Sequence, residues 1–157
     1  YFTNSLAKRL DGCSLLKVVE ATDNEKILPG TVYIGPGGFQ MTINKFGRIS
    51  ISKEPENELF KPSVNILLNS VIDAFGKNTV GIMMTGMGND GQKAFVNLSQ
   101  RNGFIIVQDI DTCVVSGMPK SVIDLKIADE IHPLAKLPEA ISSLFNLEPV
   151  QNLNRKK

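Results

Sequence analysis

The amino-acid sequence predicts an α/β fold in three layers, with helices on both faces of a mostly parallel sheet and an added antiparallel hairpin. In the second half of the chain, short apolar runs alternate with segments of helical periodicity, which is the pattern of right-handed βαβ units. In the first half, two alternating runs flank a turn at 44–47, which is a hairpin signal.

Composition supports one globular domain. The chain has 157 residues, of which 42% are hydrophobic and 21% charged, as expected for a domain with a substantial core. We place this domain at residues 1–148 and treat 149–157 as a tail. The net charge of +1 gives no reason to expect nucleic acid as a partner, and no apolar run approaches the ~20 residues that span a bilayer, so we expect no membrane insertion. Cys13 and Cys113 lie far apart, which suggests reduced thiols and a cytoplasmic protein.

The first half is predicted to contain one helix and four strands. Residues 2–10 read as a helix, because Phe2, Leu6 and Leu10 fall on one face and Gly12 ends the pattern. Strands are predicted at 15–21, 31–34, 39–43 and 48–52, with the last two forming the hairpin. Residues 53–61 are polar and irregular.

The second half is predicted to alternate between helices and strands. A helix over 63–75 has an apolar stripe and is closed by Gly76. A strand over 80–84 and a helix over 92–101 follow. The continuous apolar run at 104–107 is typical of a strand buried on both faces of a parallel sheet. We expect a short helix to open at Pro119 and a last helix to cover 137–147.

The turn between strand 80–84 and helix 92–101 is the most informative feature. It reads T-G-M-G-N-D-G over 85–91 and carries one carboxylate, Asp90, outside the carboxyl end of a strand, where open α/β sheets hold their sites. One interpretation is structural: Asp90 caps the helix that follows it. The functional interpretation is that Asp90 orients a histidine and stabilises the imidazolium form, as in serine hydrolases.

The same turn matches a dinucleotide-binding pattern. Gly86, Gly88 and Gly91 form G-x-G-x-x-G, and Asp109 follows the next strand where a ribose-binding acid would be needed. The charge on Asp90 argues against this interpretation, because two like charges ~4 Å apart cost several kcal/mol at intermediate dielectric. A dinucleotide-binding domain therefore remains only an alternative.

Several motifs together resemble the protein-glutamate methylesterases of bacterial chemotaxis. Besides T-G-M-G-N-D-G, residues 27–37 resemble the family's L-P-G-x-x-Y-I-A-P-G, and 61–65 resemble its R-P-S-V-D. Gln108 with residues 113–119 resembles its Q-x-x-x-x-C-x-V-x-G-M-P. The motifs occur in the family's order and extend over most of the chain.

The resemblance implies a domain that hydrolyses glutamate methyl esters, and deamidates glutamines, on chemoreceptors through a Ser-His-Asp triad without a cofactor or metal. It makes Asp90 the acid of the triad and assigns Met87, Gly86 and Gly88 to the oxyanion loop. It places four further residues at the substrate cleft: Thr85, Asn89, Lys61 and Ser63. The implied partners are methylated cytoplasmic segments of chemoreceptors and, in the full-length protein, a response-regulator receiver domain.

The family's nucleophile and base have no counterpart in these residues. The sequence contains no S-T-G-G, and its one histidine, His132, lies where the family has no catalytic role. We therefore expect a domain that lacks its first β-α segment, is inactive alone and is prone to association. A non-catalytic relative that binds receptors or partners is the alternative. Lys61 and Asn65 replace the family's Arg and Asp, and 38–40 is less polar than in the family.

Overall fold

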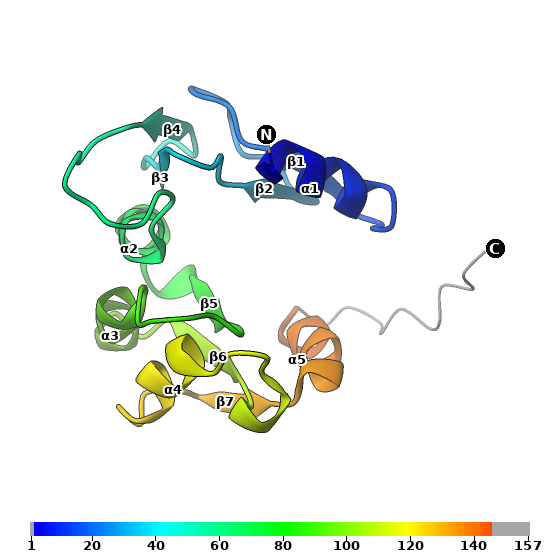
Figure 1. The fold of residues 1–157 in the computed structure, drawn as a ribbon, viewed down its shortest axis with the longest axis vertical. Coiled ribbons are helices and arrows are strands. Elements are labelled where there is room, and N and C mark those ends of the chain that lie inside the picture. Colours follow the sequence, from blue (N-terminus) through cyan, green and yellow to red (C-terminus); the bar gives the residue numbers. More distant parts are fainter. Residues whose placement is uncertain (1, 146–157) are drawn as a thin grey trace.

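The computed structural model describes residues 2–145 (Figure 1). The first half contains α1 (Phe2–Asp11), β1 (Lys17–Glu20), β2 (Thr31–Ile34), β3 (Gln40–Ile43), β4 (Ile49–Ser52) and α2 (Val64–Phe75). The second half contains β5 (Val80–Met83), α3 (Gln92–Gln100), β6 (Phe104–Gln108), α4 (Gly117–Ile123), β7 (Glu130–His132) and α5 (Leu137–Leu144). Short 3-10 turns lie at Gly76–Asn78, Ile110–Thr112 and Leu134–Lys136. No helix in this part of the chain is long and apolar enough to cross a membrane.

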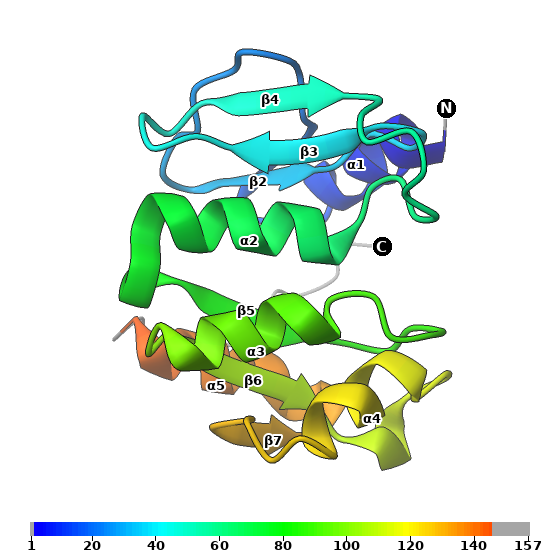
Figure 2. The same ribbon diagram turned by 90° about the vertical axis from the view of Figure 1, so that its left-hand side faces the viewer.

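The strands confirm the predicted α/β class. β1 and β2 pair in parallel, β3 and β4 form the predicted antiparallel hairpin, and β5, β6 and β7 form a parallel sheet in that order. Within the described residues these are three separate sheets, and the two parallel ones lie apart in Figure 1. Helix α2 lies between the hairpin and α3 and packs against both, as Figure 2 shows.

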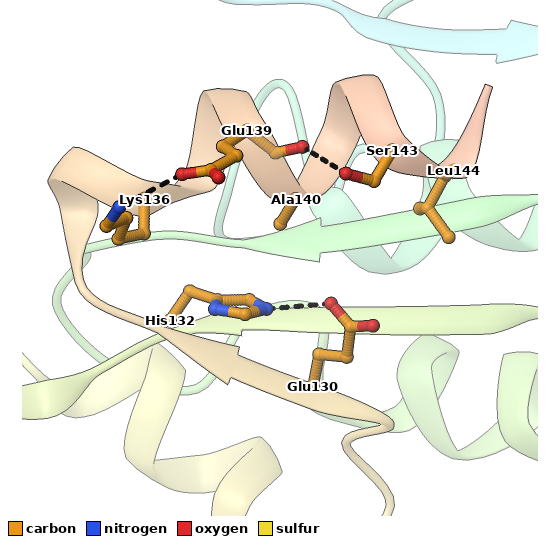
Figure 3. A pocket seen from close by; sticks show the side chains of 7 residues that line it. All are labelled: Glu130, His132, Lys136, Glu139, Ala140, Ser143 and Leu144. Carbon is orange, nitrogen blue, oxygen red and sulfur yellow. Dashed lines mark hydrogen bonds and ion pairs between the residues drawn. The ribbon is translucent and has the colours of Figure 1, made fainter. Parts of the chain in front are cut away.

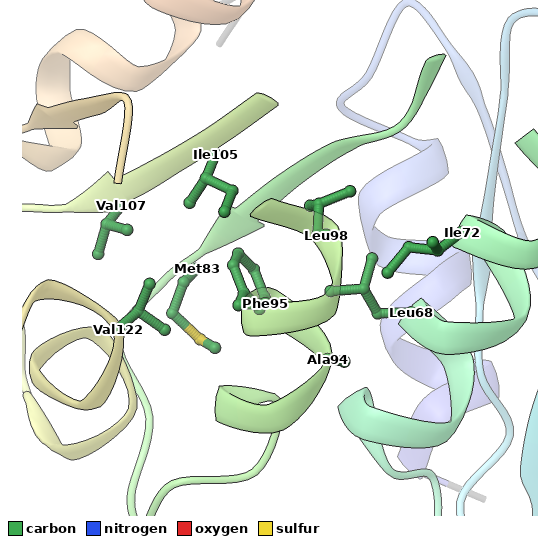
Figure 4. Packing of buried hydrophobic residues seen from close by; sticks show 9 residues of the cluster. All are labelled: Leu68, Ile72, Met83, Ala94, Phe95, Leu98, Ile105, Val107 and Val122. Carbon is green, nitrogen blue, oxygen red and sulfur yellow. The ribbon is translucent and has the colours of Figure 1, made fainter. Parts of the chain in front are cut away.

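The main core lies on one face of the β5–β7 sheet, beneath α2, α3 and α4 (Figure 4). It consists of Leu68, Ile72, Met83, Ala94, Phe95, Leu98, Ile105, Val107 and Val122. On the opposite face, Ile106 of β6 packs against Leu137 and Ala140 of α5. Helices therefore cover both faces of β6, as its continuous apolar run predicted.

Two glycines allow α3 to pack closely on this sheet. A Cβ at Gly103 would lie 2.1 Å from Leu98 Cδ1, and one at Gly81 would lie 2.6 Å from Leu98 Cδ2. Leu98 is fully buried, so neither glycine has room for a side chain. The close contact fixes the position of α3, and with it the loop that precedes α3.

Some predicted boundaries were wrong. β1 begins at Lys17 rather than at residue 15, and α4 begins at Gly117 rather than at Pro119. β7 was not predicted, because three residues are too few to show an alternating pattern. The last helix ends at Leu144 within the described residues, and the boundary proposed at 148 lies outside them.

Candidate active site

The glycine-rich turn at 85–91 joins the carboxyl end of β5 to α3, as the sequence predicted. Its carboxylate is not in bulk water, since Asp90 is only 8% exposed. Burial of a charged side chain is costly unless hydrogen bonds compensate it. The hydrogen-bond donors around the Asp90 carboxylate therefore indicate its structural role.

Three donors from the start of α2 hold the Asp90 carboxylate. Its Oδ1 accepts the Ser63 hydroxyl at 3.0 Å and the Asn65 N–H at 3.1 Å, and its Oδ2 accepts the Val64 N–H at 2.6 Å. The first N–H groups of a helix lack partners within the helix and favour a negative charge. Asp90 thus caps α2, which is distant in sequence. The prediction that it caps the helix following it was wrong, because the N-cap of α3 is Gly91, at φ 94°.

The start of α3 is capped in turn by α2. Asn65 Oδ1 accepts the N–H of Ala94 at 3.0 Å, and the Asn89 carbonyl accepts the N–H of Gln92 at 3.1 Å. A pyrophosphate would need such N–H groups free. With these donors engaged and the Asp90 charge beside them, the geometry does not favour the dinucleotide alternative. Asp109, its proposed ribose ligand, accepts the N–H of Asp111 instead.

A second layer of buried polar groups supports Ser63. Its N–H donates to Gln40 Oε1 at 2.8 Å, and Gln40 Nε2 donates to the Phe60 carbonyl at 2.7 Å. Ser63 and Gln40 are each 1% exposed. Ser63 was predicted to lie at the substrate cleft, but its side chain is buried and directed at Asp90.

The loop at 86–88, predicted to be the oxyanion loop, is held in place by the segment that follows β6. The Gly86 N–H donates to the Val115 carbonyl at 2.9 Å, and the Gly86 carbonyl accepts the Met118 N–H at 3.0 Å. Among the described residues, the N–H groups of Met87 and Gly88 donate no backbone hydrogen bond. The Met87 side chain is 81% exposed. Two backbone donors of this loop are therefore available for a ligand, whereas that of Gly86 is not.

Thr85 and Gln108 attach the two loops to each other. The Thr85 hydroxyl donates to the Val115 carbonyl at 3.0 Å and accepts the Val115 N–H at 2.9 Å. Gln108, which is fully buried, accepts the Thr85 N–H at 2.9 Å and donates to the Thr112 carbonyl at 2.9 Å. A Cβ at Gly117 would lie 2.9 Å from the Gly88 carbonyl oxygen. The motif over 108–119 thus acts as a scaffold for the glycine-rich turn, a role that sequence reasoning missed.

A cavity of about 300 Å³ lies beside Asp90. It is lined by Glu58, Leu59, Phe60, Asn65, Asn89, Asp90, Gln92 and Lys93. Of the predicted cleft residues, only Asn89 lines it. The ammonium group of Lys61 donates to the carbonyls of Lys53 at 2.7 Å and Glu56 at 3.2 Å, and so braces the preceding loop.

A larger cavity, of about 640 Å³, lies between β7 and α5 (Figure 3). It contains His132, whose Nε2 lies 2.7 Å from Glu130 Oε2, and none of the residues predicted for the site. Size alone would favour this cavity. We favour the one beside Asp90, because only that cavity adjoins a buried carboxylate that is oriented by hydrogen bonds.

Metal binding and thiol chemistry have little support in the described residues. No group of three or more His, Cys, Asp or Glu side chains in this part of the chain is placed to hold a metal ion. Partial burial, and secondarily the charge on Asp109, raises the pKa of the Cys113 thiol above its ordinary value. A protonated thiol is a poor nucleophile, so Cys113 is unsuited to that role.

Comparisons with known proteins show which family the chain resembles. A family model described as CheB methylesterase matches residues 1–141. A protein-glutamate methylesterase/protein-glutamine glutaminase 2 from Nitratidesulfovibrio vulgaris is 41% identical over 145 residues, covering 89% of this chain and 39% of that protein. A protein-glutamate methylesterase/protein-glutamine glutaminase from Methanococcoides burtonii is 40% identical over 150 residues, covering 94% and 43%.

A solved structure is similar as well. The crystal structure of the Thermotoga maritima CheB methylesterase catalytic domain aligns with a TM-score of 0.85 at 39% identity, covering 91% of this chain and 77% of that chain. By contrast, the chain spans about two fifths of the length of the curated relatives it matches.

Proposed function

Because the chain belongs to the CheB methylesterase family, we propose that it is part of an enzyme that hydrolyses glutamate methyl esters on chemoreceptors and deamidates their glutamines. The observation that carries this proposal is Asp90, a carboxylate withdrawn from bulk water, oriented by three donors and bordered by a cavity. The names of the relatives supply the substrate chemistry.

In the proposed reaction, Asp90 accepts a hydrogen bond from the imidazole of a histidine that lies outside these 157 residues. That histidine takes the proton of a serine hydroxyl as the serine oxygen attacks the ester carbonyl. The N–H groups of Met87 and Gly88 stabilise the resulting oxyanion. The imidazolium then protonates the methoxide oxygen as its bond to the carbonyl carbon breaks, so that methanol leaves, and water hydrolyses the acyl-enzyme to release the glutamate.

The β5–β7 sheet supports a further segment beside β5. Within the described residues, β5 pairs with β6 only, and its other edge adjoins an apolar groove of about 210 Å³. The groove is lined by Val64, Leu67, Leu68, Val71, Thr79, Val80, Gly81, Ile82 and Phe95. Thr79 Oγ1 is buried and has no hydrogen-bond partner in this part of the chain. The described residues therefore support a domain that is completed by another β-α segment. We keep its proposed bounds at 1–148, which extend beyond the described residues.

The proposal includes partners and location. The methylated cytoplasmic segments of chemoreceptors are the substrates, and a receiver domain regulates access to them in the whole protein, which acts in the cytoplasm. The greater length of the relatives supports an additional domain of this kind. At the two positions where the sequence differs from the family's motif, the Lys61 ammonium braces a loop and the Asn65 side chain caps α3.

The test is release of methanol from receptors that carry labelled methyl esters, by the whole protein. Hydrolysis together with conversion of receptor glutamines to glutamates is the expected result. Receptor binding without any release of methanol would instead establish the alternative, a non-catalytic binding relative. Calorimetry with the same receptor segment separates these outcomes, because it reports binding whether or not the ester is cleaved.

A further inference from the structure

The Asp90 carboxylate has one acceptor position left. An ionised carboxylate offers about four lone-pair sites on its two oxygens. Oδ1 receives two donors, from Ser63 and Asn65, whereas Oδ2 receives only the Val64 N–H. The fourth position, on Oδ2, is therefore the one open to an imidazole N–H. Its direction depends on how firmly the other three donors hold the carboxylate.

Ser63 differs from an ordinary helix-capping serine. Such a serine uses its oxygen to accept an N–H of the first turn. Here that contact, from the Ile66 N–H, is long at 3.5 Å, whereas the hydroxyl donates to Asp90 at 3.0 Å. The free N–H groups of α2 are instead satisfied by Asp90 itself. Ser63 is the N-cap residue of α2, and its hydroxyl donates to the carboxylate in addition to accepting this long capping contact.

Ser63 is in turn held in place by the side chain of Gln40. Gln40, on β3, accepts its N–H and donates to the Phe60 carbonyl, so both ends of the Gln40 amide are engaged. Ser63 and Gln40 are both almost completely buried. A fully satisfied buried network of this kind resists rotation of its members.

We propose that Ser63, held by Gln40, is a positioning residue that fixes the Asp90 carboxylate so that Oδ2 meets the imidazole of the catalytic histidine. This inference rests on the proposed function. It assigns to Ser63 a role in turnover without contact with the substrate.

The experiment compares variants of the whole protein in ester hydrolysis. Ser63→Ala is expected to lower kcat about tenfold or more with little change in KM, because a hydrogen bond to a charged group is lost. Ser63→Thr keeps a hydroxyl and should recover most of kcat. The matched control is Ser70→Ala, which also removes a hydroxyl from α2, one bonded to Ile43 N–H and the Leu67 carbonyl away from Asp90.

A double-variant cycle tests whether Ser63→Ala lowers kcat through Asp90. If Ser63 acts through Asp90, Ser63→Ala should have almost no further effect on kcat in an Asp90→Ala background. The inference is overturned if Ser63→Ala matches Ser70→Ala in kcat while the wild-type protein is active, or if its effect persists in full without Asp90. An inactive wild-type protein that binds receptor would refute the proposed function, and with it this inference.

Discussion

At the scale of single residues, Asp90 combines a capping role, which its contacts show, with the features that the proposed catalytic role requires. Its carboxylate caps a helix, yet it also borders a cavity and retains one free acceptor position. The sequence predicted that Asp90 follows the end of a strand, because the glycine-rich turn is a pattern of neighbouring residues. It could not reveal which helix Asp90 caps, because Ser63 and Asp90 are separated by 27 positions.

The two cysteines should differ in reactivity. Cys113 is partly buried and its thiol has a raised pKa, whereas Cys13 is exposed. Alkylation requires the thiolate, so at pH 8 iodoacetamide should modify Cys13 faster than Cys113. Raising the pH should increase the rate at Cys113, because its raised pKa moves thiolate formation to higher pH. Mass spectrometry of timed samples measures both rates, and equal rates at pH 8 would contradict this account.

At the scale of elements, α2 and α3 are joined at their first turns. Asp90, before α3, caps α2, and Asn65, in α2, caps α3. The two sequence motifs that contain these residues therefore form one structural unit. Sequence patterns predicted both helices but not this exchange, which depends on their relative position. The short strand β7 was missed for a different reason. Its three residues are too few to show an alternating pattern, and it is defined by its pairing with β6.

Loss of the Asn65 cap should weaken this unit. Asn65→Ala removes the acceptor for the Ala94 N–H and should lower the free energy of unfolding by ~1 kcal/mol. Asn65→Asp keeps the acceptor but adds a charge close to Asp90, so we expect an intermediate loss. Urea denaturation of the three proteins measures the effect. An unchanged midpoint for Asn65→Ala would show that the cap contributes nothing.

The contact between α3 and the sheet should tolerate no side chain at position 103. Gly103→Ala would force its Cβ against Leu98 Cδ1 and the Thr79 carbonyl, at an expected cost of about 1–3 kcal/mol. Gly12→Ala is the control, because there the nearest atoms are 3.7 Å away. Thermal unfolding of both variants is the measurement, and equal midpoints would refute the tight packing.

At the scale of the whole molecule, the described residues form two parallel sheets with the hairpin and α2 packed beside them. The sequence predicted all of these strands except β7, but not their division into separate sheets, because the pattern of a strand does not show which strands lie beside it. Within residues 2–145, β5 pairs with β6 alone, and this edge and the groove beside it are the structural basis for expecting a further segment there.

This edge should make the 157-residue chain prone to association when it is produced alone. Ile82, on β5, is 36% exposed beside the apolar groove. The chain should bind a hydrophobic dye, and Ile82→Gln should reduce that binding more than Ile131→Gln, although Ile131 is 47% exposed. An equal reduction by both variants would indicate that exposure in general, not the groove, attracts the dye.

The proposed role of Asp90, to orient a catalytic imidazole through its carboxylate, is tested most directly by the turnover of Asp90→Asn in the whole protein. The amide nearly preserves the shape of the side chain but removes its charge. Methanol release from a methylated receptor should fall by about 10⁴ in kcat, the loss seen when a serine hydrolase loses this carboxylate, with KM nearly unchanged. Turnover within about twofold of the wild-type protein would contradict the claim.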